Sequence, residues 1–347
     1  MAGEAAADGA PLRGDGYSRP TAIRPPARER TIRSYRGILT SRHGRAIRRL
    51  YRAQCAGRVH AIDPGNWFRD TPDPSDPDRP LRVIRREWLA FFSTGAKHAY
   101  RRADGGQDGY FPPPDPRETG LDRKEFFHVG RWGRYPSEVS DAALRYFDEG
   151  RALGATLLTW IEAHTPAAVT RRFSMPLSKM LEGSTGSLLR IQHYLPLRAD
   201  DSPGAVRALA HEDINLMTLL PAPNEPGLQL LDRDGIWHDI PCDPGSLIVN
   251  TGEMLHLASG GHYPATCHRV VNCGHEYHRG SRISLPLFLH AADDVVLDPG
   301  RTAAAFLLER VLAMRRQGWR PVTGGTIPAT PDDRPDAGAL HNSTEGA

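Results

Sequence analysis

Cysteine, long apolar runs and a strong net charge are all scarce in this 347-residue sequence. The four cysteines form no C-x-x-C pair, and four in so long a chain do not indicate a disulfide framework. No window approaches the ~18 apolar residues of a transmembrane helix, and residues 1–30 contain no apolar core of a secretory signal. These absences predict a cytoplasmic protein with no membrane-embedded segment.

The charges nearly balance, with 44 basic and 41 acidic residues and a formal net charge of +3. A mixed-sign surface of this kind argues against a dedicated nucleic-acid binder. The chain is 39% hydrophobic, which over 347 residues is enough for one large domain or two ordinary ones with a core of its own. We expect the protein to be a monomer.

Local composition divides the chain into several regions. Residues 1–30 and 321–347 carry few large apolar side chains and are predicted to be disordered tails. Residues 31–185 form a predicted helix-rich N-terminal region, in which apolar residues recur at helical spacing over 86–102 and 138–164.

The apolar period changes from 3.6 to 2 near Leu188, which indicates a change from helices to strands. Eight short strand candidates follow one another with turn residues between them, an arrangement typical of a sandwich or jelly roll. We therefore predict an α+β protein with a jelly-roll core over 186–295 and a closing helix within 296–320. The strand candidates are 188–195, 214–220, 227–231, 236–240, 246–250, 254–258, 268–272 and 282–289.

Two histidines and a carboxylate form a candidate metal site in this β-rich part. His211 and Asp213 are two positions apart, so on an extended strand their side chains project from the same face. His268 begins another strand candidate further along the chain. An H-x-D triplet alone occurs by chance, but two histidines and one carboxylate leave three metal positions open, the arrangement of non-haem Fe(II) oxygenases.

A second pair of residues indicates an anion site in the same sheet. Arg282 and Ser284 are again two positions apart on a predicted strand. A guanidinium fork beside a hydroxyl is well shaped to hold a carboxylate through two hydrogen bonds. An isolated arginine is more often a surface ion-pair residue, so this interpretation depends on its place beside the metal site.

With these residues in place, the region from Leu188 to His290 resembles the isopenicillin N synthase-like family of Fe(II)/2-oxoglutarate-dependent oxygenases. Upstream, Gly109-Tyr110 and D-R-K-E-F (122–126) look like marks of the N-terminal region of the same family, so that the resemblance covers about residues 100 to 315. The order and spacing of the segments carry it: R-I-Q-H-Y-L-P (190–196), H-E-D-I-N-L-M-T-L-L (211–220), G-L-Q-L (227–230), W-H-D-I-P-C-D-P-G-S-L-I-V-N-T-G (237–252), C-H-R-V-V (267–271) and R-I-S-L-P-L-F (282–288).

The resemblance implies a double-stranded β-helix fold and a specific set of site residues. His211, Asp213 and His268 would be the Fe(II) ligands. Arg282 and Ser284 would hold the distal carboxylate of 2-oxoglutarate, and Tyr194 would add a hydrogen bond to the same cosubstrate.

The activity that the resemblance implies is oxidation of a small-molecule substrate by O2, coupled to decarboxylation of 2-oxoglutarate to succinate. Related halogenases have a small residue at the carboxylate position, so Asp213 favours hydroxylation, with desaturation or cyclisation as other outcomes.

Three other functions fit parts of the pattern. An oxidase of the isopenicillin N synthase type would use the matching Arg and Ser to hold its substrate and would consume no 2-oxoglutarate. An inactive jelly-roll binding protein would use the Arg-rich segment 30–52 to contact a nucleic acid or another partner, which steep salt dependence of binding would support. A zinc hydrolase lacks an obvious general base.

Several residues near the motifs are expected to take no part in metal binding. Cys267 and Arg269 flank His268, so on a strand their side chains point away from it. The remaining histidines of this part are expected to be packed or surface imidazoles: His193, His256, His275, His278 and His290.

Overall fold

The structure is a computed structural model that describes residues 60–62, 80–101, 107–113, 123–131, 133–197, 201, 204–232, 234–240, 247–273 and 280–316. The predicted tails (1–30 and 321–347), the Arg-rich segment 30–52, His275 and His278 lie outside the described residues.

Eight strands form the larger sheet, and every pairing in it is antiparallel. The path across the sheet is β1 (His60–Ile62), β9 (Leu247–Thr251), β6 (Met217–Pro221), β12 (Leu287–Leu289), β4 (Leu188–Tyr194), β3 (Lys124–Val129) and β2 (Gly109–Phe111), with β11 (Arg282–Ser284) also paired to β4.

A second, four-stranded antiparallel sheet has the order β5 (Val206–His211), β10 (His268–Val271), β7 (Leu228–Leu231) and β8 (Trp237–Asp239). From β4 to β12 the chain passes repeatedly between the two sheets, as in a double-stranded β-helix. The predicted jelly-roll core is therefore confirmed. A short third ladder joins β13 (Val296–Asp298) to β14 (Arg301–Thr302).

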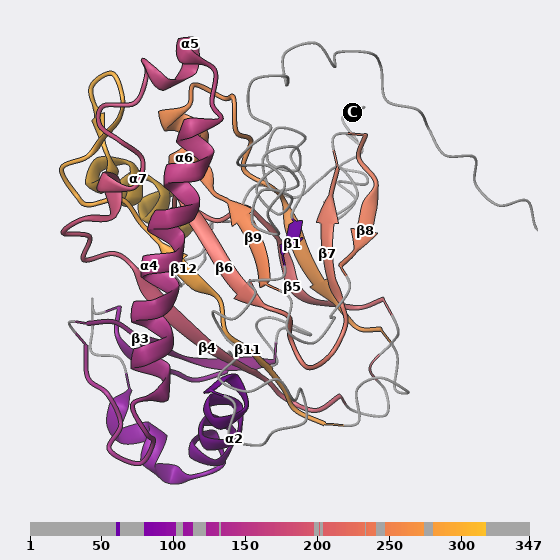
Figure 1. Cartoon of the computed structure of the whole chain (residues 1–347). Helices are drawn as coiled ribbons and strands as arrows, with labels where there is room; N and C mark the ends of the chain where they lie inside the picture. The colour runs from indigo at the N-terminus through magenta and orange to yellow at the C-terminus, as the bar shows by residue number, and fades with distance from the viewer. Residues whose placement is uncertain are drawn as a thin grey trace, which may run out of the picture.

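Helices cover the outer face of the larger sheet. In Figure 1, α4 runs across β4, β12 and β6, and α2 lies below it against β4. Among the described residues, no helix has the length and apolarity needed to cross a membrane. The helices are α2 (Pro80–Phe92), α4 (Ala142–Ala163), α5 (Ala167–Thr170), α6 (Glu253–Ala258) and α7 (Ala303–Arg316), with 3-10 turns η2 (Gly95–Tyr100) and η3 (Lys179–Leu181).

Two hydrophobic clusters give the larger sheet two buried faces. The outer cluster joins α2 and α4 to outward-facing residues such as Leu189 and Ile191 of β4. The inner cluster lies between the two sheets and comprises Tyr194, Ala208, Leu228, Ile248 and Val270. Because side chains alternate along a strand, Arg190, Gln192 and Tyr194 of β4 share the inner face. The face of the larger sheet that is turned toward the second sheet therefore carries polar side chains in the protein interior.

Two glycines let α4 approach the sheet closely. A Cβ at Gly150 would meet the side chain of Leu287, and a Cβ at Gly154 would meet that of Leu289. The two glycines are one turn apart on the helix and the two leucines share a face of β12. The two glycines thus allow α4 to pack closely on β12, the strand that follows Arg282 and Ser284 in the chain.

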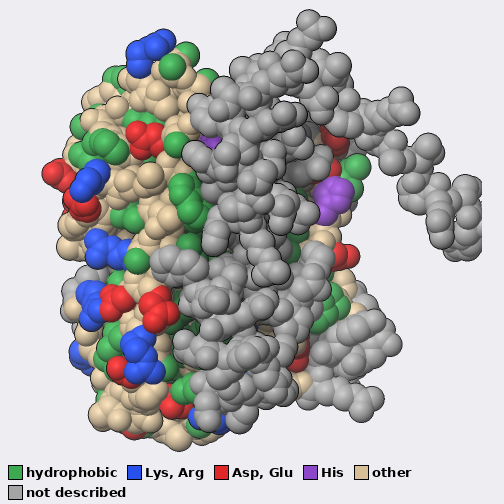
Figure 2. All heavy atoms as spheres, in the orientation of Figure 1, with side chains coloured by type: hydrophobic (Ala, Val, Ile, Leu, Met, Phe, Trp, Pro, Cys, Tyr) green, Lys and Arg blue, Asp and Glu red, His purple; other side chains and the backbone are tan. Residues whose placement is uncertain are grey.

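Charged side chains of both signs are interspersed on the visible part of the described surface (Figure 2). Exposed ion pairs join Arg131 to Asp148 and Lys179 to Glu182. Exposed pairs of this kind contribute little to stability, so the core described above carries the fold.

The prediction of a strand over 254–258 is wrong, because this segment lies in helix α6. Short apolar runs do not distinguish a strand from a helix by period alone, and Met, Leu and Ala are good helix formers. The predicted strand 282–289 is two strands, β11 and β12, interrupted at Pro286, which has no N–H to donate to the ladder.

Three further corrections concern the number and bounds of the strands. β5 contains Ala208 and Ala210, and alanine is uncommon in strands, so the segment showed no clear alternation. The predicted strand 214–220 in fact begins at Met217. The N-terminal region, predicted as helical, also supplies β2 and β3 to the larger sheet, and these strands contain the G-Y and K-E-F segments.

Candidate active site

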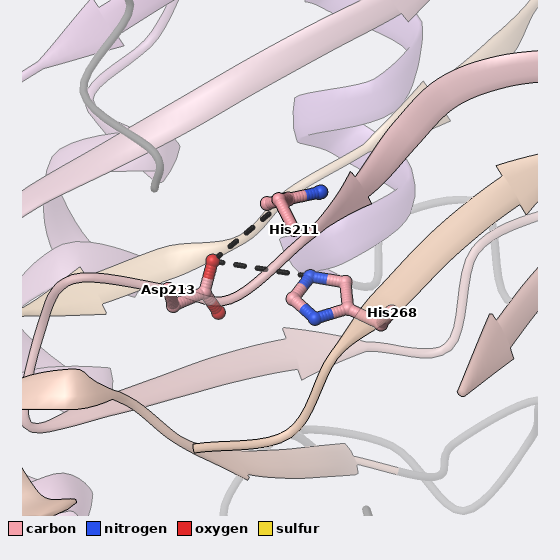
Figure 3. Close-up of side chains that lie close together, drawn as sticks. All are labelled: His211, Asp213 and His268. Carbon is pink, nitrogen blue, oxygen red and sulfur yellow. Dashed lines mark ion pairs between the residues drawn. The ribbon is translucent and has the colours of Figure 1, made fainter. Parts of the chain in front are cut away.

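His211, Asp213 and His268 lie together, as predicted (Figure 3). His211 ends β5 and His268 begins β10, and the two residues are register partners across the ladder. Their ring centroids are 4.3 Å apart. Asp213 Oδ1 is 4.0 Å from His211 Nε2 and 3.8 Å from His268 Nε2. Each residue offers one ligand atom, and the three atoms lie within 4.8 Å of one another.

Asp213 reaches this group by a different route from the one predicted. It lies two residues beyond the end of β5, so the two side chains do not share the face of one strand. The N-terminus of α6 holds the segment instead: Glu253 N donates to Asp213 O at 2.7 Å, and Met254 N donates to Ile214 O at 3.1 Å. Backbone contacts with a helix therefore place the carboxylate.

The two imidazoles present lone pairs toward the carboxylate. Nδ1 of His211 lies 2.7 Å from the carbonyl oxygen of Leu209, and Nδ1 of His268 lies 3.0 Å from that of Thr266. A carbonyl only accepts, so Nδ1 carries the proton and Nε2 is left as a donor of electrons to a metal. Burial, and after it the neighbouring His268, lowers the pKa of His211 to about 3, which keeps this ring neutral.

The two oxygens of the Asp213 carboxylate have different surroundings. Oδ2 accepts hydrogen bonds from Thr218 Oγ1 at 2.5 Å and from Asn250 Nδ2 at 3.0 Å. Oδ1, which faces the histidines, has no hydrogen-bond partner among the described residues although the side chain is 2% exposed. Burial would raise the pKa of Asp213, but the hydrogen bonds from Thr218 and Asn250 stabilise the carboxylate, and the pKa is lowered. An anionic oxygen buried without a partner between two lone pairs is suited to a cation.

Thr218 and Asn250 were missed from the sequence. They are register partners on β6 and β9, in segments that are otherwise apolar. They could have been identified as polar residues within buried apolar strands, because a buried polar side chain needs a hydrogen-bond partner.

Arg282, Ser284 and Tyr194 are also brought together on the inner face. β11 pairs with β4 so that Arg282 is opposite Tyr194 and Ser284 is opposite Gln192. The Arg282 guanidinium carbon is 4.8 Å from the centroid of the Tyr194 ring. The Tyr194 hydroxyl donates to Gln192 Oε1 at 3.1 Å.

Arg282 is 1% exposed and only partly hydrogen-bonded within the described chain. Its Nε donates to Glu225 O at 3.4 Å, and its Nη1 is buried without a partner among the described residues. A buried guanidinium with an unused donor is costly unless an anion completes it. The inner face near Tyr194 therefore suits a carboxylate.

A further arginine, Arg207 of β5, was not identified from the sequence. It is buried, donates to Leu195 O at 2.6 Å, and its guanidinium carbon lies 5.2 Å from the centroid of the Tyr194 ring. Burial, and second the charge of Arg282, lowers the pKa of Arg207. Two neighbouring cations enclosed in the protein make this region favourable for a ligand that carries more than one negative charge.

The neighbouring residues lie as expected. Arg269 points away from the metal group: its guanidinium carbon is 4.0 Å from the centroid of the Trp237 ring and its Nε donates to Gln229. His193 is bonded to Glu125 and Ser281. His290 is buried, and this burial lowers its pKa to about 4.

Comparison with known proteins agrees with this geometry. Residues 186–291 match the family model of the 2OG-Fe(II) oxygenase superfamily. A proposed oxygenase of Shewanella oneidensis, known from a crystal structure, is 40% identical, with 78% of this chain and 95% of that chain covered and a TM-score of 0.68. A proposed 2OG-Fe(II) oxygenase family protein of Caulobacter crescentus is 26% identical, with coverage of 78% and 96% and a TM-score of 0.62.

Among curated proteins, gibberellin 3-beta-dioxygenase 2 of Arabidopsis thaliana is 34% identical over 116 residues, which cover 33% of this chain and 31% of that protein. The chain thus spans about a third of the length of this relative. Given the family match and the near-complete coverage of the Shewanella protein, the chain belongs to the 2OG-Fe(II) oxygenase superfamily, as its motifs predict.

Proposed function

We propose that this protein is an Fe(II)- and 2-oxoglutarate-dependent dioxygenase that hydroxylates a small molecule. The observation that carries the proposal is the unsatisfied Oδ1 of buried Asp213 between two imidazoles whose Nδ1 atoms are already engaged. Two neutral nitrogen donors and one carboxylate suit Fe(II) and leave positions for other ligands. His211, Asp213 and His268 would hold the metal.

Arg282, Ser284 and Tyr194 would hold the distal carboxylate of 2-oxoglutarate. The buried Nη1 of Arg282 supplies an unused charged donor, and Arg207 adds positive charge beside the same Tyr194 ring. In this superfamily, Fe(II) and 2-oxoglutarate together supply oxidation by O2 coupled to decarboxylation of the cosubstrate. The residues of this chain bind and orient the two partners and keep the cosubstrate carboxylate in an enclosed, positively charged environment.

The experiment that tests the proposal replaces Arg282 by leucine. Loss of a charge-assisted contact worth roughly 1.5–3 kcal/mol should weaken 2-oxoglutarate binding by at least ten- to a hundredfold. Calorimetric binding of 2-oxoglutarate and succinate release in the absence of substrate measure this. Arg269→Leu is the matched control, because Arg269 packs on an aromatic ring on the opposite side of β10.

The same experiment separates this function from the oxidase alternative. An oxidase of the isopenicillin N synthase type predicts O2 uptake that is independent of 2-oxoglutarate and releases no succinate. Succinate released in proportion to O2 consumed supports the dioxygenase; O2 uptake without succinate supports the oxidase. The monomeric state and the cytoplasmic location stay predictions from the sequence.

A further inference from the structure

Strand β11, which carries Arg282 and Ser284, has a neighbour on only one side among the described strands. It pairs with β4, and its other edge meets no described strand. Backbone N–H and C=O groups on such an edge need other partners. Asn224, in the loop that follows β6, supplies them with its side chain. The position of Arg282 therefore depends on this loop as well as on β4.

Asn224 bonds to the peptide groups on both sides of Arg282. Asn224 Nδ2 donates to Ser281 O at 3.3 Å, and Ile283 N donates to Asn224 Oδ1 at 3.0 Å. A carbonyl only accepts and an N–H only donates, so these partners define the orientation of the amide. One side chain thus makes the two hydrogen bonds that a residue of a neighbouring strand would make.

The same loop contacts the side chain of Arg282. Arg282 Nε donates to Glu225 O at 3.4 Å, while Nη1 is buried without a partner among the described residues. The accepting carbonyl belongs to the residue directly after Asn224. The loop therefore holds the backbone of Arg282 through Asn224, and it orients the guanidinium through the next peptide group.

The loop is itself held at both ends. Arg85 Nη2 of α2 donates to Ala222 O at 2.7 Å. Pro223 and Pro226 flank the two contact residues, and a proline ring fixes φ near −65°. Gly227 has a φ of 112°, and a Cβ there would be 2.4 Å from a backbone oxygen of β10. A loop with these restraints is suited to keep another side chain in one position.

From these contacts we infer that Asn224 is a positioning residue for the cosubstrate. It holds β11 so that Arg282 presents Nη1 to the distal carboxylate of 2-oxoglutarate, and it acts through Arg282 without touching the cosubstrate. Asn224 is exposed, and replacing an exposed side chain usually changes stability little. The inference rests on the proposed function and extends the carboxylate site to a residue on the surface.

The test compares binding of 2-oxoglutarate with binding of 2-oxopentanoate, which has a methyl group in place of the distal carboxylate. Calorimetric titrations of the full-length protein loaded with Mn(II) give the ratio of the two dissociation constants. We expect the wild type to prefer 2-oxoglutarate at least tenfold. Asn224→Ala should reduce this preference about three- to tenfold, the range for loss of one hydrogen bond. Binding of 2-oxopentanoate and of Mn(II) should stay within twofold of wild type.

A double-mutant cycle shows whether the effect passes through Arg282. In Arg282→Leu protein, adding Asn224→Ala should change the preference no further. Gln229→Ala is the matched control, because the Gln229 amide also donates one hydrogen bond, to Asp239, and accepts one, from Arg269. This control should keep the preference of the wild type.

An unchanged preference in Asn224→Ala, or equal weakening of both ligands, overturns the inference. A further loss in the Arg282→Leu background also overturns it, because the effect would then bypass Arg282. If the alanine variant does not fold, Asn224→Asp places an anionic oxygen against Ser281 O, and a folded aspartate variant with the wild-type preference overturns the inference. A wild type that binds neither ligand, or binds both equally, contradicts the proposed function itself.

Discussion

At the scale of single residues, the two carboxylate oxygens of Asp213 have different roles. Oδ2 accepts hydrogen bonds from Thr218 and Asn250, and Oδ1 faces the histidines. Groups that orient a ligand carboxylate typically change metal affinity 10- to 100-fold when removed. We therefore expect Asn250→Ala to weaken Mn(II) binding, measured by EPR titration, by about tenfold or more. Asn272→Ala is the control, because Asn272 is equally buried and binds the carbonyl of Asp201 instead. Equal loss in both variants contradicts a specific role of Asn250.

Glu125 is a second buried carboxylate, and its ionisation is coupled to the stability of the folded protein. It is 2% exposed and accepts hydrogen bonds from Tyr110 Oη at 2.5 Å, Lys97 Nζ at 2.9 Å and His193 Nδ1 at 2.8 Å. Burial would raise the pKa of Glu125, but the three hydrogen bonds outweigh it and lower the pKa from its ordinary value of 4.5.

A lowered pKa in the folded state means that the Glu125 contribution to stability is complete above pH ~4.5 and is lost as the pH falls through the lowered value. Glu125→Gln removes this titration and leaves imperfectly matched hydrogen bonds. We expect the variant to be about 2–3 kcal/mol less stable at pH 7, with a difference from wild type that narrows toward pH 3. Urea unfolding from pH 7 to 3 measures it; a difference that is constant with pH contradicts the assignment.

The residue scale also shows what the sequence was able to predict. His211, Asp213 and His268 were identifiable because metal-binding side chains are chemically distinctive and the motif order is specific. Arg207 and Asn250 were not, because an arginine and an asparagine occur widely on surfaces. Their roles depend on which strands become neighbours.

At the scale of elements, helix α6 matters more to the site than its six residues indicate. Its first N–H groups bind the carbonyls of residues 213–215, and Gly252 lies directly against the same segment. A Cβ at Gly252 would be 2.6 Å from Asp213 O. The sequence pattern predicted a strand here, since the decisive contacts are with a segment distant in the chain.

Gly252→Ala should therefore displace the segment that holds Asp213. We expect a loss of about 1–3 kcal/mol in the free energy of unfolding, as for overpacking in a core, together with weaker Mn(II) binding. Gly95→Ala is the control, because a Cβ at Gly95 would meet no atom within 4 Å. Unchanged stability and metal affinity in Gly252→Ala would show that the segment accommodates the methyl group.

At the scale of the whole molecule, the passage of the chain between two sheets brings together residues that are distant in sequence. The outer face of the larger sheet carries the helices, and the inner face carries Arg282, Tyr194 and Arg190 opposite the strands with His211 and His268. Hydrophobic periodicity predicted this architecture, because jelly-roll strands repeat a period of two. The register between strands, which sets the chemistry, depends on bulges such as those between β5 and β10.

Because the candidate ligands come from the end of β5, the segment after it and the start of β10, a metal would bind only the folded chain. Ligand binding to the native state stabilises it by about 2.7 kcal/mol at a concentration 100-fold above the dissociation constant. For a 347-residue protein, with an unfolding entropy of ~2.1 cal/mol/K per residue, that corresponds to a rise of roughly 4 °C in Tm. We expect Mn(II) to produce such a rise in the wild type, reversed by EDTA, and to produce none in His211→Ala or His268→Ala. Glu212→Gln is the control, because Glu212 is adjacent to His211 and Asp213 in the chain but does not belong to the three-residue group. Its charge interacts with Glu253 and Arg310 instead. A metal-dependent rise that persists in both histidine variants would place the metal elsewhere in the molecule.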